Sequence, residues 1–523
     1  MKGLITSIIT VLTCAGLQAQ SISGPKLVVG VTIDQLRTDY LEAFSSLYGE
    51  RGFKRLWREG RVYQNAEYSF PKVDRSSAIA SLNTGTTPSY HGVIANEWMD
   101  VASLRVLSCV DDPQYMGNYT TQCSSASNLL CSTIADELKV ATQQKGLVYA
   151  IAPDRDAAVL SAGHIGNGAF WINPYTGKWC STTYYGDFPW WVSEVNEKES
   201  IDKKIDNLTW TPTYPKERYV FLPEWKDKEF CYSFSDGKFR QYKKLIASPL
   251  VNDEVNLLVQ KLLDSSVLGT DEISDFLSIT YYAGNYDHKN VRECAMEMQD
   301  TYVRLDKKMG DLLDMLDQKV GLGNVLLYVT STGYSDVEAA DLGLYRIPGG
   351  QFYLNRCAAL LNMYLMAKYG VGQYVEAYYN QQIYLNHKLI EDKSLDLAEV
   401  QNKSEEFLTQ FSGVGDVYSG NRLLCKAWSP ELLKIKNGYH RKNSGDLLID
   451  VLPGWTILNE DIQKEETAVR YGMLPISVFF MGSGIQPEKI SIPIRVEQIA
   501  PTVTKVLRIR SPNGSSVRPL NLR

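Results

Sequence analysis

The chain has 523 residues, of which 44% are hydrophobic and 22% are charged. This composition is that of a globular protein and excludes a disordered, collagen-like or coiled-coil chain. The formal net charge is −6, from 54 basic and 60 acidic residues, and no block of like charge stands out, so we expect no nucleic-acid partner.

The first nineteen residues predict a signal peptide. Lys2 provides a short basic start, residues 4–17 form an apolar run, and Ala19 supplies the small residue of a cleavage site. The apolar run is too short and too interrupted for a membrane span, and no later stretch reaches about 18 uninterrupted apolar residues. We therefore expect an exported protein without a transmembrane segment, in the periplasm or outer envelope of a Gram-negative bacterium, with a mature chain that begins near Gln20.

Eight cysteines remain after removal of this peptide. An even number permits disulfides in an exported protein, but the spacing assigns no pairing. No Cys-x-x-Cys pair occurs, so the sequence does not support a zinc ribbon.

Apolar runs and helical patterns alternate along the chain. The runs over 26–34, 146–153, 275–283, 324–332 and 476–482 predict buried strands. Apolar residues spaced by three and four between 291 and 316 predict a helix. Together they predict a doubly wound, mostly parallel α/β sheet flanked by helices, with ligands bound beyond the carboxyl ends of the strands. We expect one domain over 20–523, with inserted cap segments near 165–245 and 340–445.

Motifs at the ends of these elements resemble the alkaline phosphatase superfamily. They include Val31 to Arg37, Gly52 to Leu56, Asn83 to Val93, Asn96-Glu97-Trp98, Arg155 to His164, Ser181 to Tyr185, Arg346 to Gly350, Asn380 to Leu385, Ser444-Gly445-Asp446, Pro453-Gly454-Trp455 and Ile499 to Thr502. More narrowly, the chain looks like the exported bacterial phosphate-monoester hydrolases related to nucleotide pyrophosphatases/phosphodiesterases. The resemblance covers nearly the whole mature chain and implies an alkaline-phosphatase-like fold.

The resemblance also implies a catalytic centre of two zinc ions held by three Asp and three His, with a Thr or Ser nucleophile between the metals. Such a centre stabilises the attacking and leaving oxygens of an in-line phosphoryl displacement. The first carboxylate is present as Asp34. The nucleophile position holds Arg75 when counted back from Thr84-Gly85 and Asp74 when matched forward from Pro71, and the nearest hydroxyls are Ser76 and Ser77.

Most of the other implied zinc ligands are missing. Asn285, Ser331, Thr332 and Lys464 stand at ligand positions, and the implied Asp-x-x-x-His pair has become Asn285-Tyr286-Asp287-His288. Of the five histidines, only His288 occupies a ligand position. We therefore expect no cofactor, in contrast to the two zinc ions of active relatives.

Two residues match those that hold phosphate oxygens in the family. They are Asn96 and Arg155, although the lysine usual two positions before that arginine is Pro153 here. Arginine is a good bidentate donor to phosphate. A lone arginine in a loop, however, is more often the partner in a structural salt bridge.

The sequence is compatible with two functions. The missing ligands predict a catalytically degenerate protein, a pseudoenzyme that serves as an exported binding or scaffold component of the bacterial envelope, with a protein partner or an anionic ligand. The alternative is an active phosphate-ester hydrolase, a phosphomonoesterase or phosphodiesterase. Its rebuilt site, metal-dependent through a single metal or else metal-independent, would consist of Asp34, Asp74, Asp287 and His288.

Overall fold

The computed structural model describes residues 24–220, 222, 229–289, 291–335, 348–425, 429–459, 465–468, 474–482 and 484–522. The predicted signal peptide and Lys464 lie outside these residues. The centre of the molecule is one large sheet with the strand order β21-β2-β20-β12-β1-β11-β6-β7-β8-β5, and β22 pairs with β2. The strands are β1 (Leu27–Asp34), β2 (Arg61–Glu67), β5 (Gly117–Asn118), β6 (Val148–Ile151), β7 (Gly168–Ile172), β8 (Trp179–Thr182), β11 (Asp275–Tyr282), β12 (Val325–Ser331), β20 (Ile476–Gly482), β21 (Glu488–Ile490) and β22 (Ile494–Arg495).

The middle of this sheet is parallel. Strand β1 pairs in parallel with β11 and with β12, β11 with β6, and β6 with β7. Strand β20 runs antiparallel to β12 and to β2. The prediction of a mostly parallel α/β sheet is confirmed, and all five predicted strands are present.

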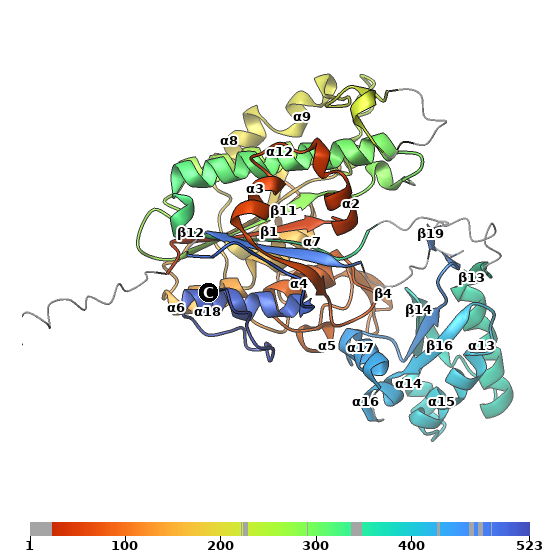
Figure 1. The fold of residues 1–523 in the computed structure, drawn as a ribbon. Coiled ribbons are helices and arrows are strands. Elements are labelled where there is room, and N and C mark those ends of the chain that lie inside the picture. Colours follow the sequence, from red (N-terminus) through yellow and green to blue (C-terminus); the bar gives the residue numbers. More distant parts are fainter. Residues whose placement is uncertain are drawn as a thin grey trace, which may run out of the picture.

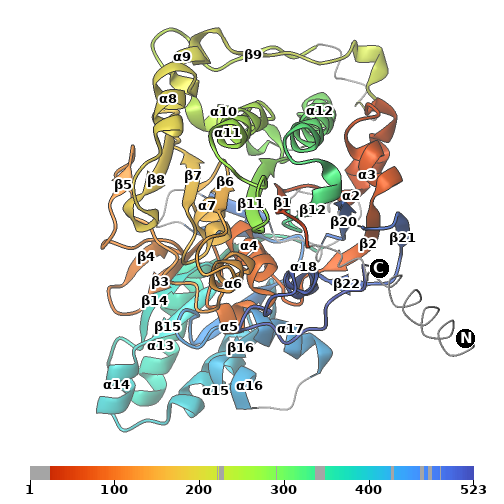
Figure 2. The ribbon, with the colours of Figure 1, turned by 90° about the vertical axis from the view of Figure 1, so that its left-hand side faces the viewer.

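Helices cover both faces of the sheet (Figures 1 and 2). One face carries α3 (Phe53–Glu59), α11 (Val251–Ser265) and α12 (Ala295–Lys319), and the other carries α4 (Arg75–Thr84), α6 (Ile134–Ala141), α7 (Arg155–Ala162) and α18 (Ile499–Leu507). Strand β1 shows why this arrangement is stable, because its side chains alternate between two apolar cores. Val29 and Val31 pack in the core that contains Leu262 of α11, whereas Val28 packs in the core that contains Val503 of α18.

Gly30 is required by the packing of this strand. A Cβ atom at this position would lie 2.2 Å from the hydroxyl oxygen of Tyr328 on β12. Any larger residue would therefore displace the Tyr328 side chain from the core.

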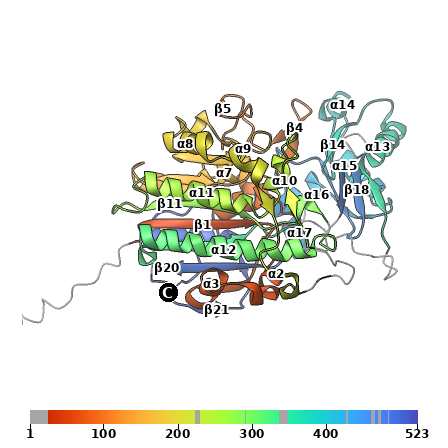
Figure 3. The same ribbon diagram turned by 90° about the horizontal axis from the view of Figure 1, so that it is seen from above.

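A smaller unit lies beyond the carboxyl ends of the parallel strands (Figures 1 and 3). It contains an antiparallel sheet of order β14-β15-β17-β16, with its own apolar core. Its elements are β13 (Gln351–Tyr353), α13 (Leu354–Tyr369), β14 (Val375–Tyr379), β15 (Gln382–Leu385), α14 (His387–Asp392), α15 (Leu397–Leu408), β16 (Val414–Ser419), α16 (Gly420–Cys425), α17 (Pro430–Gly438), β17 (Leu447–Val451), β18 (Thr456–Asn459) and β19 (Glu465–Ala468).

Side-chain contacts fasten this unit to the main sheet domain. Lys72 donates to Gln381 Oε1 at 2.6 Å, and the Tyr379 hydroxyl donates to Glu97 Oε2 at 3.1 Å.

The region near 165–245 begins with β7 and β8, which extend the main sheet, and continues through α8 (Trp190–Lys198), α9 (Ile201–Lys204), β9 (Thr209–Trp210), β10 (Tyr232–Ser233) and α10 (Tyr242–Ile246). Further short α-helices and strands are α2 (Thr38–Ala43), α5 (Pro88–His91), β3 (Glu97–Asp100) and β4 (Arg105–Ser108).

Two further features concern the residues that the structure describes. None of the helices in these ranges combines the length and the apolar character needed to cross a membrane. Of the nine cysteines of the sequence, the eight that follow the predicted signal peptide are described, and these eight are free thiols.

A partly buried ion pair between His164 and Asp136 of α6 leads to a prediction about the pH dependence of stability. The two ring nitrogens of His164 both face acceptors, Asp136 Oδ2 at 2.8 Å and the Leu129 carbonyl oxygen at 2.8 Å. A neutral imidazole has only one N–H, so only the imidazolium satisfies both acceptors. Although burial lowers the pKa of His164, the hydrogen bond to Asp136 and its charge raise it above its ordinary value.

The pKa of His164 is higher in the folded protein than in the unfolded one. The ion pair therefore stabilises the fold fully at a pH below the pKa of the unfolded state, and this stabilisation is lost as the pH rises through the pKa of the folded state. We expect His164→Gln to lower the free energy of unfolding by about 1 kcal/mol more at pH 6 than at pH 9, since the ring is partly exposed. Urea unfolding of both proteins at the two pH values measures this difference. An equal loss of unfolding free energy at pH 6 and at pH 9 would contradict this prediction.

Candidate functional site

The candidate site lies at the carboxyl edge of the main sheet, where one arginine meets three carboxylates. Arg75 Nη1 lies 3.0 Å from Asp154 Oδ2 and 3.5 Å from Asp34 Oδ2. Arg75 Nε and Nη2 each lie 2.9 Å from an oxygen of Asp156. Asp34 ends β1, Asp154 and Asp156 flank the start of α7, and Arg75 is the first residue of α4. We call these four residues the Arg75 cluster.

The start of α4 explains why Arg75 points to this cluster and Asp74 does not. Asp74 is the N-cap, and its carboxylate accepts from Ser77 N at 2.9 Å and from Asn96 N at 2.5 Å. The side chain of Asn96 in turn accepts from Ser76 N at 2.9 Å. Asp74 and Asn96 thus satisfy backbone donors at the helix start. Of the two residues at the predicted nucleophile position, only Arg75 reaches the three carboxylates.

Asp34 is buried and surrounded by donors. Its oxygens accept from the Thr332 hydroxyl at 3.0 Å and from the Tyr334 hydroxyl at 3.2 Å, in addition to the contact with Arg75. Burial raises the pKa of Asp34, and the charge of Arg75 opposes that rise. Ser331 also stands at one of the implied ligand positions, and its hydroxyl donates to the Leu36 carbonyl oxygen at 2.7 Å.

The two carboxylates of α7 differ in their electrostatics. Burial raises the pKa of Asp156, but the charge and hydrogen bonds of Arg75 outweigh it and lower the pKa below its ordinary value. Burial and the neighbouring carboxylates raise the pKa of Asp154 to about 6, against the opposing charge of Arg75. A carboxyl group whose pKa is raised in this way is a candidate for proton transfer.

Two cavities meet at this cluster. The first, of about 290 Å³, is lined by Asp154 and His288, and the second, of about 450 Å³, is lined by Asn96 and by residues of the smaller unit such as Tyr379 and Gln381. Arg75, Arg155 and Asp156 line both cavities. Arg155 Nη2 lies 2.8 Å from Asp111 Oδ1, and its Nη1 donates to the Ser124 hydroxyl at 3.2 Å. Two guanidinium groups therefore stand where the cavities adjoin.

The segment that replaces the implied Asp-x-x-x-His pair is only partly in the site. His288 lines the first cavity, and its charge acts on Asp154. Asp287 instead lies 3.7 Å from Lys244 Nζ, and the Asn285 amide donates to the Lys289 carbonyl oxygen at 2.8 Å. The hypothesis of a site built from Asp34, Asp74, Asp287 and His288 therefore keeps Asp34 and His288 near the cavities, while Asp74 caps a helix.

The described residues do not fit a two-zinc centre. They contain no group of three or more His, Cys, Asp or Glu side chains that could hold a metal ion. The carboxylates that do converge, those of the Arg75 cluster, already surround a guanidinium, and its positive charge repels a divalent cation. The chemistry of the site must therefore be derived from its own side chains.

Sequence reasoning named Asp34, Arg75, Arg155 and His288 but missed the roles of Asp154 and Asp156. A signal was present, because the pair flanks Arg155 directly after a predicted strand, where ligands of parallel sheets bind. Tyr334 was missed as well. Its contact with Asp34 depends on the register of β1 and β12, and no short motif encodes that register.

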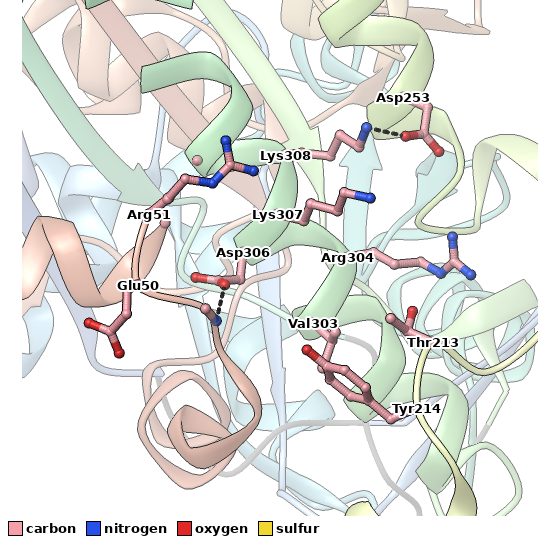
Figure 4. A pocket seen from close by; sticks show the side chains of 13 residues that line it. Glu50, Arg51, Thr213, Tyr214, Asp253, Val303, Arg304, Asp306, Lys307 and Lys308 are labelled. Atoms are coloured by element: carbon pink, nitrogen blue, oxygen red, sulfur yellow. Dashed lines mark hydrogen bonds and ion pairs between the residues drawn. The ribbon is translucent and has the colours of Figure 1, made fainter. Parts of the chain in front are cut away.

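A third cavity, of about 410 Å³, lies against α12 and is also rich in cations (Figure 4). Most of these cations have acidic partners. Lys308 contacts Asp253 at 2.6 Å, and Arg304 contacts Asp300 at 2.7 Å. These charges are compensated, as those of Arg75 and Arg155 are, and the described lining of this cavity contains none of the site residues named from the sequence.

Residues 28–473 match the family described as type I phosphodiesterase / nucleotide pyrophosphatase. This match spans well over half of the chain, and the chain belongs to that family, within the alkaline phosphatase superfamily.

Individual relatives resemble nearly the whole chain. Alkaline phosphatase PafA of Elizabethkingia meningoseptica is 30% identical over 96% of this chain and 95% of its own. A protein of Myroides odoratus named calcium-transporting ATPase is 29% identical over 98% of both chains, and alkaline phosphatase PhoV of Synechococcus elongatus is 29% identical over 95% of this chain and 92% of its own. The crystal structure of wild type PafA matches with a TM-score of 0.82 over 95% of this chain and 98% of its own, at 29% identity.

These findings correct one prediction. The expectation of a catalytically degenerate binding or scaffold protein is wrong, because the chain resembles proteins named alkaline phosphatases over almost its full length. That expectation came from counting implied zinc ligands. Positive charge for a phosphate can also come from guanidinium groups, which the count ignored and which the site contains.

Proposed function

We propose that this protein is a phosphate-ester hydrolase that acts at the Arg75 cluster and the two adjoining cavities. The observation that carries the proposal is the placement of Arg155, which lines both cavities. Guanidinium groups bind phosphate oxygens in a bidentate geometry and stabilise the negative charge of the transition state. Membership of a phosphodiesterase family supports this class of substrate.

Asp154 is the proton acceptor in the proposed reaction. A water molecule attacks phosphorus, its proton passes to the Asp154 carboxylate, and the bond between phosphorus and the ester oxygen breaks. The departing alkoxide then takes a proton from solvent. Asp154 suits this role because it lines the first cavity and because burial raises the pKa of its carboxyl group to about 6, which makes it a better proton acceptor than an ordinary aspartate.

The test is the release of p-nitrophenol from its phosphate monoester and from its bis ester, measured in chelator and with added zinc. Since the acceptor must be deprotonated, we expect kcat/KM to rise with pH up to about 6 and to level above it. Asp154→Asn should lower kcat about 100-fold in chelator.

Two outcomes would contradict the proposal. One is the absence of release of p-nitrophenol from either ester under all these conditions. The other is a rate that Asp154→Asn leaves unchanged. Release that requires zinc would place the chemistry on groups other than those assigned here.

A further inference from the structure

One lysine in the wall of the first cavity differs from the two arginines there. Arg75 lies 3.0 Å from a carboxylate oxygen of Asp154. Arg155 lies 2.8 Å from one of Asp111. Lys243 of α10 lines the same cavity, and among the described residues its ammonium group has no carboxylate partner. The charge of this lysine is therefore available to an anionic ligand, whereas the two guanidinium charges are already compensated.

We infer that Lys243 determines substrate specificity by binding a second anionic group, which the substrate carries on its leaving group. The inference rests on the proposed function, because it takes the reacting phosphate to lie where the two cavities adjoin. Lys243 lines only the first cavity, whereas Arg155 lines both. A substrate whose phosphate lies at Arg155 can therefore extend its leaving group along the first cavity to Lys243.

The surroundings of Lys243 hold its ammonium group at the cavity. Lys243 Nζ lies 4.6 Å from the centre of the Tyr175 ring, which is a cation–π contact. The turn that carries Tyr175 packs against α10, since a Cβ atom at Gly177 would lie 2.6 Å from Cε1 of Tyr242. Tyr242 is buried and directly precedes Lys243. A ring contact orients the lysine without cancelling its charge, and the ammonium group keeps donors for an anion.

The wall between the charged groups suits the carbon skeleton of such a substrate. The first cavity is also lined by the apolar residues Trp171, Ile172, Pro174 and Ile246. Ligand sites commonly combine an apolar wall with a few polar groups that fix the orientation of the ligand. Here Arg155 and Lys243 are the polar groups, and we expect a substrate with an anion at each end of an apolar linker.

Isothermal titration with phosphonates tests the inference without turnover, because their carbon–phosphorus bond is not an ester. 4-Carboxybenzylphosphonate carries the second charge, and 4-carbamoylbenzylphosphonate is its neutral counterpart of nearly the same shape. We expect the unmodified protein to bind the carboxylate about tenfold more tightly than the amide, since a hydrogen bond between two charged groups is stronger than one to a neutral acceptor. Lys243→Ala should reduce this ratio of affinities to about one, and Lys243→Arg should retain it.

A matched control is Lys178→Ala. Lys178 also lies over a tyrosine ring, that of Tyr119 at 5.9 Å, but it lines neither cavity. This variant should keep the preference for the carboxylate. A third probe, p-xylylenediphosphonate, replaces the carboxylate by a phosphonate, and the probe that loses more affinity in Lys243→Ala shows which anion the lysine prefers.

Three outcomes would overturn the inference. They are equal affinities of the unmodified protein for the carboxylate and the amide, a preference that survives Lys243→Ala, and the absence of binding by any of these phosphonates. Since Lys243 is exposed, its replacement leaves the apolar core intact and the variants can be compared as folded proteins. Failure of the proposed function shows itself separately, as an absence of p-nitrophenol release, and the titration then still decides whether Lys243 binds the second anion.

Discussion

Replacing Asp156 by alanine is expected to lower the free energy of unfolding by roughly 3–5 kcal/mol, the range seen when one partner of a buried ion pair is removed. Asp156 is 7% exposed and binds Arg75 through both oxygens. One of these oxygens also accepts from the Ser76 hydroxyl at 2.7 Å. The substitution would leave the guanidinium with weaker compensation and the serine without its acceptor.

Urea unfolding measures this loss. Asp156→Asn should cost less than Asp156→Ala, because the amide oxygen still accepts from Ser76 or Arg75. Glu272→Ala is a matched control, since Glu272 also contacts a cation, Lys26 at 2.6 Å, but its side chain is 84% exposed. An exposed pair of this kind contributes about 0–1 kcal/mol. A loss for Asp156→Ala no larger than that of the control would show that the cluster is not important for stability.

Replacing Arg155 by alanine is expected to lower kcat/KM for p-nitrophenyl phosphate by about 100- to 1000-fold, the effect of removing one fixed donor to transition-state charge. Arg155→Lys should recover only part of the rate, because an ammonium group cannot bind phosphate in a bidentate geometry. The measurement is the initial rate of p-nitrophenol release at several substrate concentrations.

The control is Arg51→Ala in the cavity against α12. Arg51 is an arginine with acidic partners like Arg155, contacting Asp314 at 2.5 Å, but it lies in the cavity of Figure 4 and not at the sheet edge. We expect its rate to equal that of the unmodified protein. If Arg155→Ala only lowers thermal stability and leaves kcat/KM unchanged, the contact of Arg155 with Asp111 is its whole role.

The order of strands along the chain was predictable because apolar runs are a local signal. The run over 26–34 becomes β1, and the run over 324–332 becomes β12. The same logic placed Asp34 and Arg155 near one edge, since the carboxyl ends of parallel strands meet there. The charge state of the site was not predictable, because Asp34, Arg75 and Asp156 are far apart in sequence.

The nucleophile position shows where sequence reasoning stopped. Asp74 and Arg75 are neighbours, and counting residues from either side could not choose between them. The structure separates them, because Asp74 turns back to cap α4 while Arg75 projects from the first helical residue toward three acids. A shift of one residue at a helix start changes the direction of the side chain completely.

By itself, the sequence determined the α/β class and the strand segments, because hydrophobic periodicity is a local property. Only the tertiary structure decided which side chains meet at the carboxyl edge of the sheet. The strand pairing and the packing of α4 against α7 bring Arg75 between Asp34, Asp154 and Asp156. Charges interact through space with a strength set by distance and burial, and neither quantity can be read from positions along the chain.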